Sequence, residues 1–222
     1  MLTISAIYTS QALVQPLTDI FNKELPECRL INIADDQLIM DVIKEGKVTK
    51  NIIKRMFYYY HASVAAGADY ILNTCSSVSE VVDLANQFIE IPILKIDEPM
   101  IIKAIKSGQR IGVLATLPTT LKPTVNLIYK KAQEMNKKVE IIKGLAEGGF
   151  QALIEGKPEQ HDEIIIETAK RISAKVDIIV LAQGSMARIE SLLEKNTGIK
   201  VLSSLRLSVL YLKKNLKRKL MI

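Results

Sequence analysis

The sequence predicts an α/β protein made of two similar lobes, each a mostly parallel sheet with flanking helices. Two observations predict this fold class. Short apolar, β-branched runs alternate with longer segments of helical periodicity, and the pattern of the first half of the chain recurs in the second. The 222 residues suffice for one large domain or for two lobes of roughly 100 residues each. With 48% hydrophobic and 24% charged residues, the composition is that of a globular protein.

Eight short runs have the composition of strands. The segments between them include Leu13–Leu25 and Leu121–Ala132, where apolar residues recur every three or four positions, as in an amphipathic helix. Because strands alternate with helices, we expect parallel pairing and ligand sites at the carboxyl ends of the strands. The predicted strands are Leu2–Tyr8, Arg29–Ile33, Tyr70–Thr74, Pro92–Ile96, Arg110–Ala115, Val139–Lys143, Asp177–Ala182 and Ile199–Leu202.

The chain also repeats itself at a nearly constant spacing. Three segments of the first half resemble segments of the second half, at an offset of 107 for the first and of 108 for the other two. Chance similarity among strands is the alternative, but three matches at one spacing favour a duplication. The pairs are Ile4–Thr9 with Ile111–Thr116, Asp69–Ser77 with Asp177–Ser185, and Ile91–Leu94 with Ile199–Leu202.

The repeat predicts the lobes and their equivalent turns. We expect lobe one at residues 1–100, joined by a C-terminal helix at 205–222, and lobe two at residues 101–204. If two such lobes face each other, Cys75 and Gln183 lie across one cleft, because they occupy equivalent strand ends.

Several classes of protein are disfavoured by simple counts. No run of 18 apolar residues is present, so we expect no membrane span. The N-terminus lacks a basic stretch followed by an apolar run, so we expect no secretory signal. Cys28 and Cys75 do not make a disulfide framework, which favours a reduced, cytoplasmic setting. His61 and His161 add too few ligands for a metal cluster.

The net charge of +6 is concentrated in one short segment. Residues 211–222 carry +5, which leaves +1 on the rest of the chain. A basic C-terminal helix end complements the helix dipole and is usually a solvated surface. We therefore expect no nucleic-acid partner, and a DNA-binding C-terminal helix is kept only as a competing hypothesis. The basic residues are Lys213, Lys214, Lys217, Arg218 and Lys219.

Cys75 is the main catalytic candidate. It ends an apolar strand, and Ser77 with Glu80 three residues later forms a capping-box pattern that predicts a helix starting at Ser77. Unpaired backbone N–H groups and the helix dipole at that place favour the reactive thiolate, so we expect a low pKa for the Cys75 thiol. An inert buried thiol is the alternative. The polar neighbours Thr74 and Ser76 argue against it, whereas Cys28 has no such setting.

The other strand ends carry hydroxyl groups suited to a small anion. Hydroxyls and helix N-terminal amides can hold a carboxylate without a metal or a phosphate-binding loop. Plain helix capping is the alternative role for the same residues. The glycine-rich fingerprints of dinucleotide and ATP binding are absent from the sequence. The expected substrate-binding residues are Thr9, Ser10, Thr74, Ser76, Ser77, Thr116, Thr119, Thr120, Gly184 and Ser185.

Four segments, in this order, carry a resemblance to a known family: Ile71–Val78, Lys95–Met100, Arg110–Thr116 and Leu181–Arg188. Over essentially its full length, the chain resembles the aspartate/glutamate/hydantoin racemase superfamily. The resemblance implies two α/β lobes related by pseudo-twofold symmetry, with the active site in the cleft between them. It also implies cofactor-independent chemistry at the carbon next to a carboxylate or carbonyl of a small acid, amino acid or hydantoin. A homodimer is a further expectation from the resemblance.

One position departs from the family pattern. In the racemases, two cysteines flank the reacting carbon. Cys75 matches the first, whereas Gln183 stands at the position of the second. An amide neither gives nor takes a proton near neutral pH, so Gln183 can act only through hydrogen bonds. The sequence therefore predicts a racemase-like isomerase in which two-thiol racemisation is difficult. A one-thiol lyase or decarboxylase, a maleate-type isomerase and a non-catalytic small-anion binding protein remain as alternatives.

Overall fold

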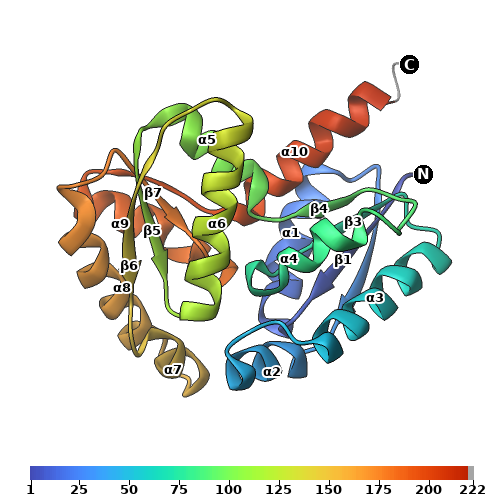
Figure 1. Cartoon of the computed structure of the whole chain (residues 1–222), viewed down its shortest axis with the longest axis horizontal. Helices are drawn as coiled ribbons and strands as arrows, with labels where there is room; N and C mark the ends of the chain where they lie inside the picture. The colour runs from blue at the N-terminus through green and yellow to red at the C-terminus, as the bar shows by residue number, and fades with distance from the viewer. Residues whose placement is uncertain (220–222) are drawn as a thin grey trace. The chain divides into compact units, whose positions relative to one another are not determined.

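The computed structural model describes residues 1–219 of the chain, which form two compact units (Figure 1). The first unit, lobe one, comprises residues 1–96 and the C-terminal segment that starts at Leu205, and the second, lobe two, comprises residues 97–204. Residues 220–222 of the expected C-terminal helix, and the side chains of Lys217, Arg218 and Lys219, lie outside the described part.

Lobe one contains a four-stranded parallel sheet in the order β2-β1-β3-β4. The central strand β1 is buried at every residue, as expected for a strand covered on both faces, whereas most residues of the edge strand β2 are partly or fully exposed. The strands are β1 (Thr3–Tyr8), β2 (Arg29–Ala34), β3 (Tyr70–Asn73) and β4 (Ile93–Lys95).

Helices cover the sheet of lobe one. The helices α2, α3 and α4 bury apolar residues in one core with Ile7 of β1 and Ile71 of β3. The helices α1 and α10 lie side by side (Figure 1), and Glu24 joins them by ion pairs with Arg206 at 3.2 Å and Lys213 at 3.5 Å. The helical elements are η1 (Gln11–Leu13), α1 (Val14–Glu24), α2 (Gln37–Glu45), α3 (Lys50–Ala65), η2 (Ser76–Val78), α4 (Glu80–Ala85) and α10 (Ser204–Lys219).

Lobe two has the same architecture, with a parallel sheet in the order β6-β5-β7-β8. In Figure 1, α5 and α6 cover one face of this sheet, and α8 and α9 cover the other. The strands are β5 (Arg110–Ala115), β6 (Glu140–Leu145), β7 (Ile178–Leu181) and β8 (Lys200–Leu202). The helical elements are α5 (Glu98–Ser107), α6 (Pro118–Glu134), α7 (Gly149–Ile154), α8 (Pro158–Ser173), η3 (Gly184–Ile189) and α9 (Glu190–Thr197).

The structure confirms the α/β fold class and all eight predicted strands, with ends that differ by at most two residues. The two sheets repeat each other in strand order and in register. Ile4 pairs with Tyr70 in lobe one as Ile111 pairs with Ile178 in lobe two, at offsets of 107 and 108. Among the described residues, no helix is both long and apolar enough to cross a membrane.

In each lobe, an aspartate just before the second inner strand accepts hydrogen bonds from the backbone at the start of the first inner strand. Asp69 accepts a hydrogen bond from the backbone N–H of Thr3 at 2.8 Å. Asp177 accepts bonds from the backbone N–H groups of Arg110, at 2.8 Å, and Gln109, at 3.0 Å, and also from the Arg110 guanidinium. The backbone and side-chain donors of Arg110, with the N–H of Gln109, lower the pKa of Asp177 to about 2.

Replacing Asp177 with asparagine should lower the urea midpoint of unfolding at neutral pH, because the charged acceptor is lost. A lowered pKa in the folded state stabilises the fold above the ordinary value of 3.8, and this stabilisation disappears as the pH falls towards 2. The difference between wild type and Asp177→Asn should therefore shrink over that range in urea titrations. The exposed Glu163→Gln variant is the control. A difference that stays constant with pH would contradict the role of the Asp177 charge.

Candidate active site

In lobe one, the sheet brings two predicted site turns to the same edge. Strands β1 and β3 are parallel neighbours, with Ile7 opposite Asn73. The turn after β1, with Thr9 and Ser10, therefore lies beside the turn after β3, which begins with Thr74 and Cys75. The predicted site residues of lobe one thus come together.

Cys75 lies at the start of the 3-10 turn η2, in extended conformation. It is half-buried. The hydroxyl of Thr9, the backbone N–H groups of Ser77 and Val78, and the side chain of Ser77 act as hydrogen-bonding groups that lower the pKa of its thiol. All these groups belong to lobe one. Several donors therefore surround the sulfur and would stabilise negative charge on it.

The expectation of a low pKa for Cys75 is wrong in direction. Burial raises the pKa of the thiol, and this effect outweighs the hydrogen bonds from Thr9, Ser77 and Val78, which lower it. The resting group is therefore the protonated thiol. The same donors remain in place to stabilise the thiolate once the proton has left.

The predicted start of the following helix is also corrected. A single 3-10 turn occupies Ser76–Val78, and the α-helix α4 begins at Glu80, three residues later than the capping box indicated. Ser79 occupies the N-cap position without a side-chain cap. The backbone N–H groups beside Cys75 therefore belong to a 3-10 turn and not to an α-helix. N–H groups near the start of such a turn also lack helical partners.

Two buried residues that the sequence analysis did not single out fix the backbone of Cys75. Asn73 donates from its side-chain amide to the carbonyl oxygen of Cys75 at 3.0 Å. Tyr60 donates from its hydroxyl to Asn73 Oδ1 at 3.3 Å. The available signal was Asn73 itself, a polar residue within an otherwise apolar strand.

The remaining predicted residues of lobe one have different local roles. Thr74 donates from its hydroxyl to the carbonyl of Ile7 at 2.9 Å, so it ties the two strand ends together. Ser10 caps η1 by accepting the N–H of Ala12 at 3.4 Å. Ser76 and Ser77 are buried in the turn. Ser10 thus has the helix-capping role that was the alternative to ligand binding, and Thr74 has a structural role of another kind.

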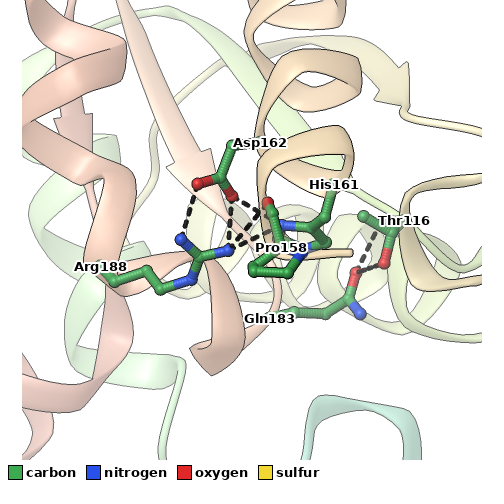
Figure 2. Close-up of polar contacts among 6 residues, drawn as sticks. All are labelled: Thr116, Pro158, His161, Asp162, Gln183 and Arg188. Atoms are coloured by element: carbon green, nitrogen blue, oxygen red, sulfur yellow. Dashed lines mark hydrogen bonds and ion pairs between the residues drawn. The ribbon is translucent and has the colours of Figure 1, made fainter. Parts of the chain in front are cut away.

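In lobe two, β5 and β7 bring the Thr116 and Gln183 turns together in the same way. Gln183 Oε1 accepts two hydrogen bonds from Thr116, one from its backbone N–H at 2.6 Å and one from its hydroxyl at 3.0 Å (Figure 2). At the equivalent place in lobe one, the hydroxyl of Thr9 is among the groups that lower the pKa of Cys75. The repeat therefore places a threonine beside the residue at the neighbouring strand end in both lobes.

The Thr116 bonds fix the orientation of the Gln183 amide. A backbone N–H can be accepted only by the carbonyl oxygen, so the NH₂ group is the part of Gln183 left to donate to a ligand. Thr119, in the first turn of α6, has a buried Oγ1 without a hydrogen-bond partner among the described residues. Thr120 is buried nearby. Lobe two therefore offers hydrogen-bond donors but no thiol at this edge.

The turn after Gln183 is a 3-10 turn, η3, that contains Gly184 and Ser185. Helix capping, the alternative role for Ser185, is not found, because α9 starts only at Glu190 and Ile189 is its N-cap residue. Ser185 is half-buried within η3. The helical segment after Gln183 begins with a 3-10 turn, as the segment after Cys75 does.

Arg188 at the end of η3 ties this turn to the first turn of α8. Its guanidinium donates to both carboxylate oxygens of Asp162, each at 2.6 Å, and to the carbonyl of Pro158 at 3.3 Å (Figure 2). His161, which is fully buried, lies beside Asp162, with 2.8 Å between His161 Nδ1 and Asp162 Oδ1. The sequence analysis placed no histidine near the Gln183 turn, so His161 is a further residue that it missed.

Charged residues in three of the four segments that carry the family resemblance form ion pairs within their own lobes. Lys95 pairs with Asp83 at 2.8 Å, and Arg110 pairs with Asp177 at 2.6 Å. Arg188 pairs with Asp162. Within the described residues, no group of three or more histidine, cysteine or acidic residues is arranged to hold a metal ion.

Comparison with known proteins assigns the family. The model of the Asp/Glu/Hydantoin racemase family matches residues 8–212. The chain belongs to this family. No curated protein sequence matches it.

Solved structures of racemases share the fold of this Asp/Glu/Hydantoin racemase family member. A glutamate racemase from Francisella tularensis, in complex with D-glutamate, is 16% identical with a TM-score of 0.77, covering 100% of this chain and 83% of that one. Allantoin racemase from Klebsiella pneumoniae is 15% identical with a TM-score of 0.69, covering 98% and 88%. Aspartate racemase from Picrophilus torridus is 15% identical with a TM-score of 0.72, covering 97% and 94%. At these identities, the likeness shows the fold.

The pKa of Cys75 can be measured from the pH dependence of iodoacetamide labelling in a Cys28→Ala background. We expect labelling to rise only above the ordinary titration range of a thiol, because burial raises the pKa. Thr9→Val should move the profile further up, since a donor to the thiolate is lost. Thr18→Val, on α1, is the matched control. A profile centred below the ordinary thiol pKa would contradict the burial argument.

Proposed function

We propose that this family member transfers a proton at the carbon next to a carboxylate or carbonyl of a small acid, amino acid or hydantoin, with Cys75 as the catalytic thiol. The observation that carries the proposal is the set of donors from Thr9, Ser77 and Val78 around a sulfur whose pKa is raised. A protonated thiol is suited to donate a proton to an enolate-like intermediate. The surrounding donors then stabilise the thiolate that remains.

We propose a hydrogen-bonding role for the Gln183 turn, which serves the same substrate as the Cys75 turn in this proposal. Thr116 occupies the carbonyl oxygen of Gln183 and leaves its NH₂ group to donate to a carboxylate or carbonyl oxygen. Thr119 Oγ1 offers a further buried hydroxyl. Such donors stabilise charge that develops on the oxygen when the neighbouring carbon loses a proton.

The raised pKa of the Cys75 thiol favours some of the alternative reactions over others. A maleate-type isomerisation needs a nucleophilic thiolate in the resting enzyme, which burial of Cys75 disfavours. Protonation after a decarboxylation needs the thiol and stays compatible with the site. A binding protein without catalysis is the second candidate function, and the replacement of the second family cysteine by Gln183 favours it.

We further propose that the protein is cytoplasmic, needs no cofactor and forms a homodimer.

The test of the proposed function is exchange of the α-proton in D₂O, followed by ¹H NMR. The probes are the separate enantiomers of glutamate, aspartate and a 5-substituted hydantoin, with a sample lacking protein as the blank. We expect wild-type protein to exchange at least one probe, and Cys75→Ala to lose roughly 10²–10⁴-fold in rate for an enantiomer that depends on the thiol. Cys28→Ala is the matched cysteine control and should keep the wild-type rate. Exchange that survives Cys75→Ala unchanged for every probe would remove Cys75 from the reaction.

Replacing Gln183 with cysteine should place a thiol at the strand end where the family has its second one. We expect Gln183→Cys to raise the rate of racemisation relative to Gln183→Ala, because it adds a group that can transfer a proton. Chiral chromatography of the products measures this directly. Equal rates for the two variants would mean that the Gln183 turn does not lie against the reacting carbon.

A further inference from the structure

His161 is a buried polar residue whose surroundings do not explain its presence. Its exposed fraction is 0%, and its Nε2 atom has no hydrogen-bond partner among the described residues. A buried polar atom without a partner lowers the stability of the fold, because its hydrogen bonds to water are lost and not replaced. The repeat provides a comparison, because α3 of lobe one corresponds to α8. The first buried residue of α3 is the apolar Ile52, with Met56 and Tyr60 following at intervals of four.

The same spacing in α8 runs through His161, Ile165 and Ala169, so His161 is the first buried residue of α8 as Ile52 is of α3. The corresponding helix of lobe one thus begins its buried face with an apolar side chain. The histidine replaces it at an energetic cost, which indicates a role for the imidazole other than packing.

The Nδ1 atom of His161 has a hydrogen-bond partner that fixes the tautomer of the imidazole. Asp162 accepts a bond from Nδ1 at 2.8 Å, and the Arg188 guanidinium binds both oxygens of that carboxylate. Arg188 Nη2 is 3.4 Å from Nδ1 but carries only donor hydrogens. Because the carboxylate is solely an acceptor, the proton is assigned to Nδ1, which leaves the lone pair on Nε2. A carboxylate that orients an imidazole in this way prepares its other nitrogen to act as a base.

His161 also lies at the functional end of lobe two. In a parallel α/β unit, a helix that connects two strands runs back along the sheet, so its first turn lies at the carboxyl ends of the strands. Gly149 packs between Thr116 and α8, because a Cβ there would lie 2.8 Å from Thr116 Cγ2 and 3.9 Å from Ile164 Cγ2. In the view of Figure 2, the imidazole lies between the Asp162–Arg188 pair and the Thr116–Gln183 pair.

We propose that His161 is the acid–base group of lobe two, which takes the place of the second thiol that Gln183 cannot supply. This inference rests on the proposed function. In the forward step, the C–H bond next to the carboxylate or carbonyl breaks and an Nε2–H bond forms, while the electron pair moves into the enolate. Cys75 then delivers its S–H proton to the opposite face, forms the new C–H bond and becomes a thiolate. Turnover in the reverse direction, or proton exchange with water, restores both groups.

The burial of Nε2 has a consequence for how it acts. Nε2 is buried in the free protein, so water does not compete for its lone pair. Binding of a substrate should therefore change the environment of His161 much more than that of the exposed His61.

The proposal is tested by deuterium exchange measured separately for each enantiomer of the probe that wild-type protein turns over. Two different bases act on opposite faces, so His161→Leu should lose roughly 10²-fold or more for one enantiomer and Cys75→Ala for the other. Asp162→Asn, which leaves the histidine in place, should cause a smaller loss for the same enantiomer as His161→Leu. His61→Leu is the matched histidine control and should behave as wild type. Thermal unfolding of each variant checks that it is folded.

The outcomes separate this inference from the proposed function. If wild-type protein exchanges no probe, both are overturned. If Cys75→Ala loses activity while Asp162→Asn and a folded His161→Leu exchange both enantiomers at wild-type rates, the proposed function stands and the role of His161 is wrong. Equal losses for both enantiomers in His161→Leu and Asp162→Asn would show a structural role only, and this also overturns the inference. In the tautomer proposed here, ¹⁵N NMR should show the proton on Nδ1, and a proton on Nε2 would contradict it.

Discussion

The candidate site depends on the parallel pairing of β1 with β3 and of β5 with β7 in the same register. This pairing brings the end of the central strand of each lobe beside the end of its neighbour. A threonine that follows the central strand then lies beside the residue at the neighbouring strand end: Thr116 bonds Gln183, and the Thr9 hydroxyl acts to lower the pKa of Cys75. The duplication therefore preserves an interaction as well as a fold, while the chemistry of the residue that is held has diverged between the lobes.

This divergence determines what each lobe can contribute. In lobe one, burial keeps the Cys75 thiol protonated, and the amides of η2 with the Thr9 hydroxyl stabilise the charge left after proton donation. In lobe two, the held residue is an amide that can only hydrogen-bond. The one buried imidazole of lobe two, His161, is oriented by Asp162, which Arg188 in turn fixes. In the proposal, Cys75 and His161 are the two groups that transfer protons, one from each lobe.

Much of the fold was predictable because it depends on local patterns. Alternating strand and helix periodicity gave the parallel sheets, and the constant offset gave their duplication. The proximity of Thr9 to Cys75 and of Thr116 to Gln183 followed from strand ends that share an edge. The pKa of Cys75 did not follow, because burial is a tertiary property and here outweighs the local amides. The 3-10 turns were missed since capping patterns do not distinguish them from the first turn of an α-helix. His161 was missed because only tertiary packing joins the start of α8 to η3.

Protection of Cys75 from iodoacetamide tests most directly the claim that substrate binds at the Cys75 turn. Labelling of both cysteines is followed by mass spectrometry in one sample, with increasing concentrations of the compound that shows α-proton exchange. We expect this compound to slow the labelling of Cys75 in a saturable way and to leave that of Cys28 unchanged, because Cys28 lies before β2 at the opposite end of the strands. A compound that is turned over while the labelling of Cys75 stays unchanged, or while both cysteines are slowed equally, would contradict the account.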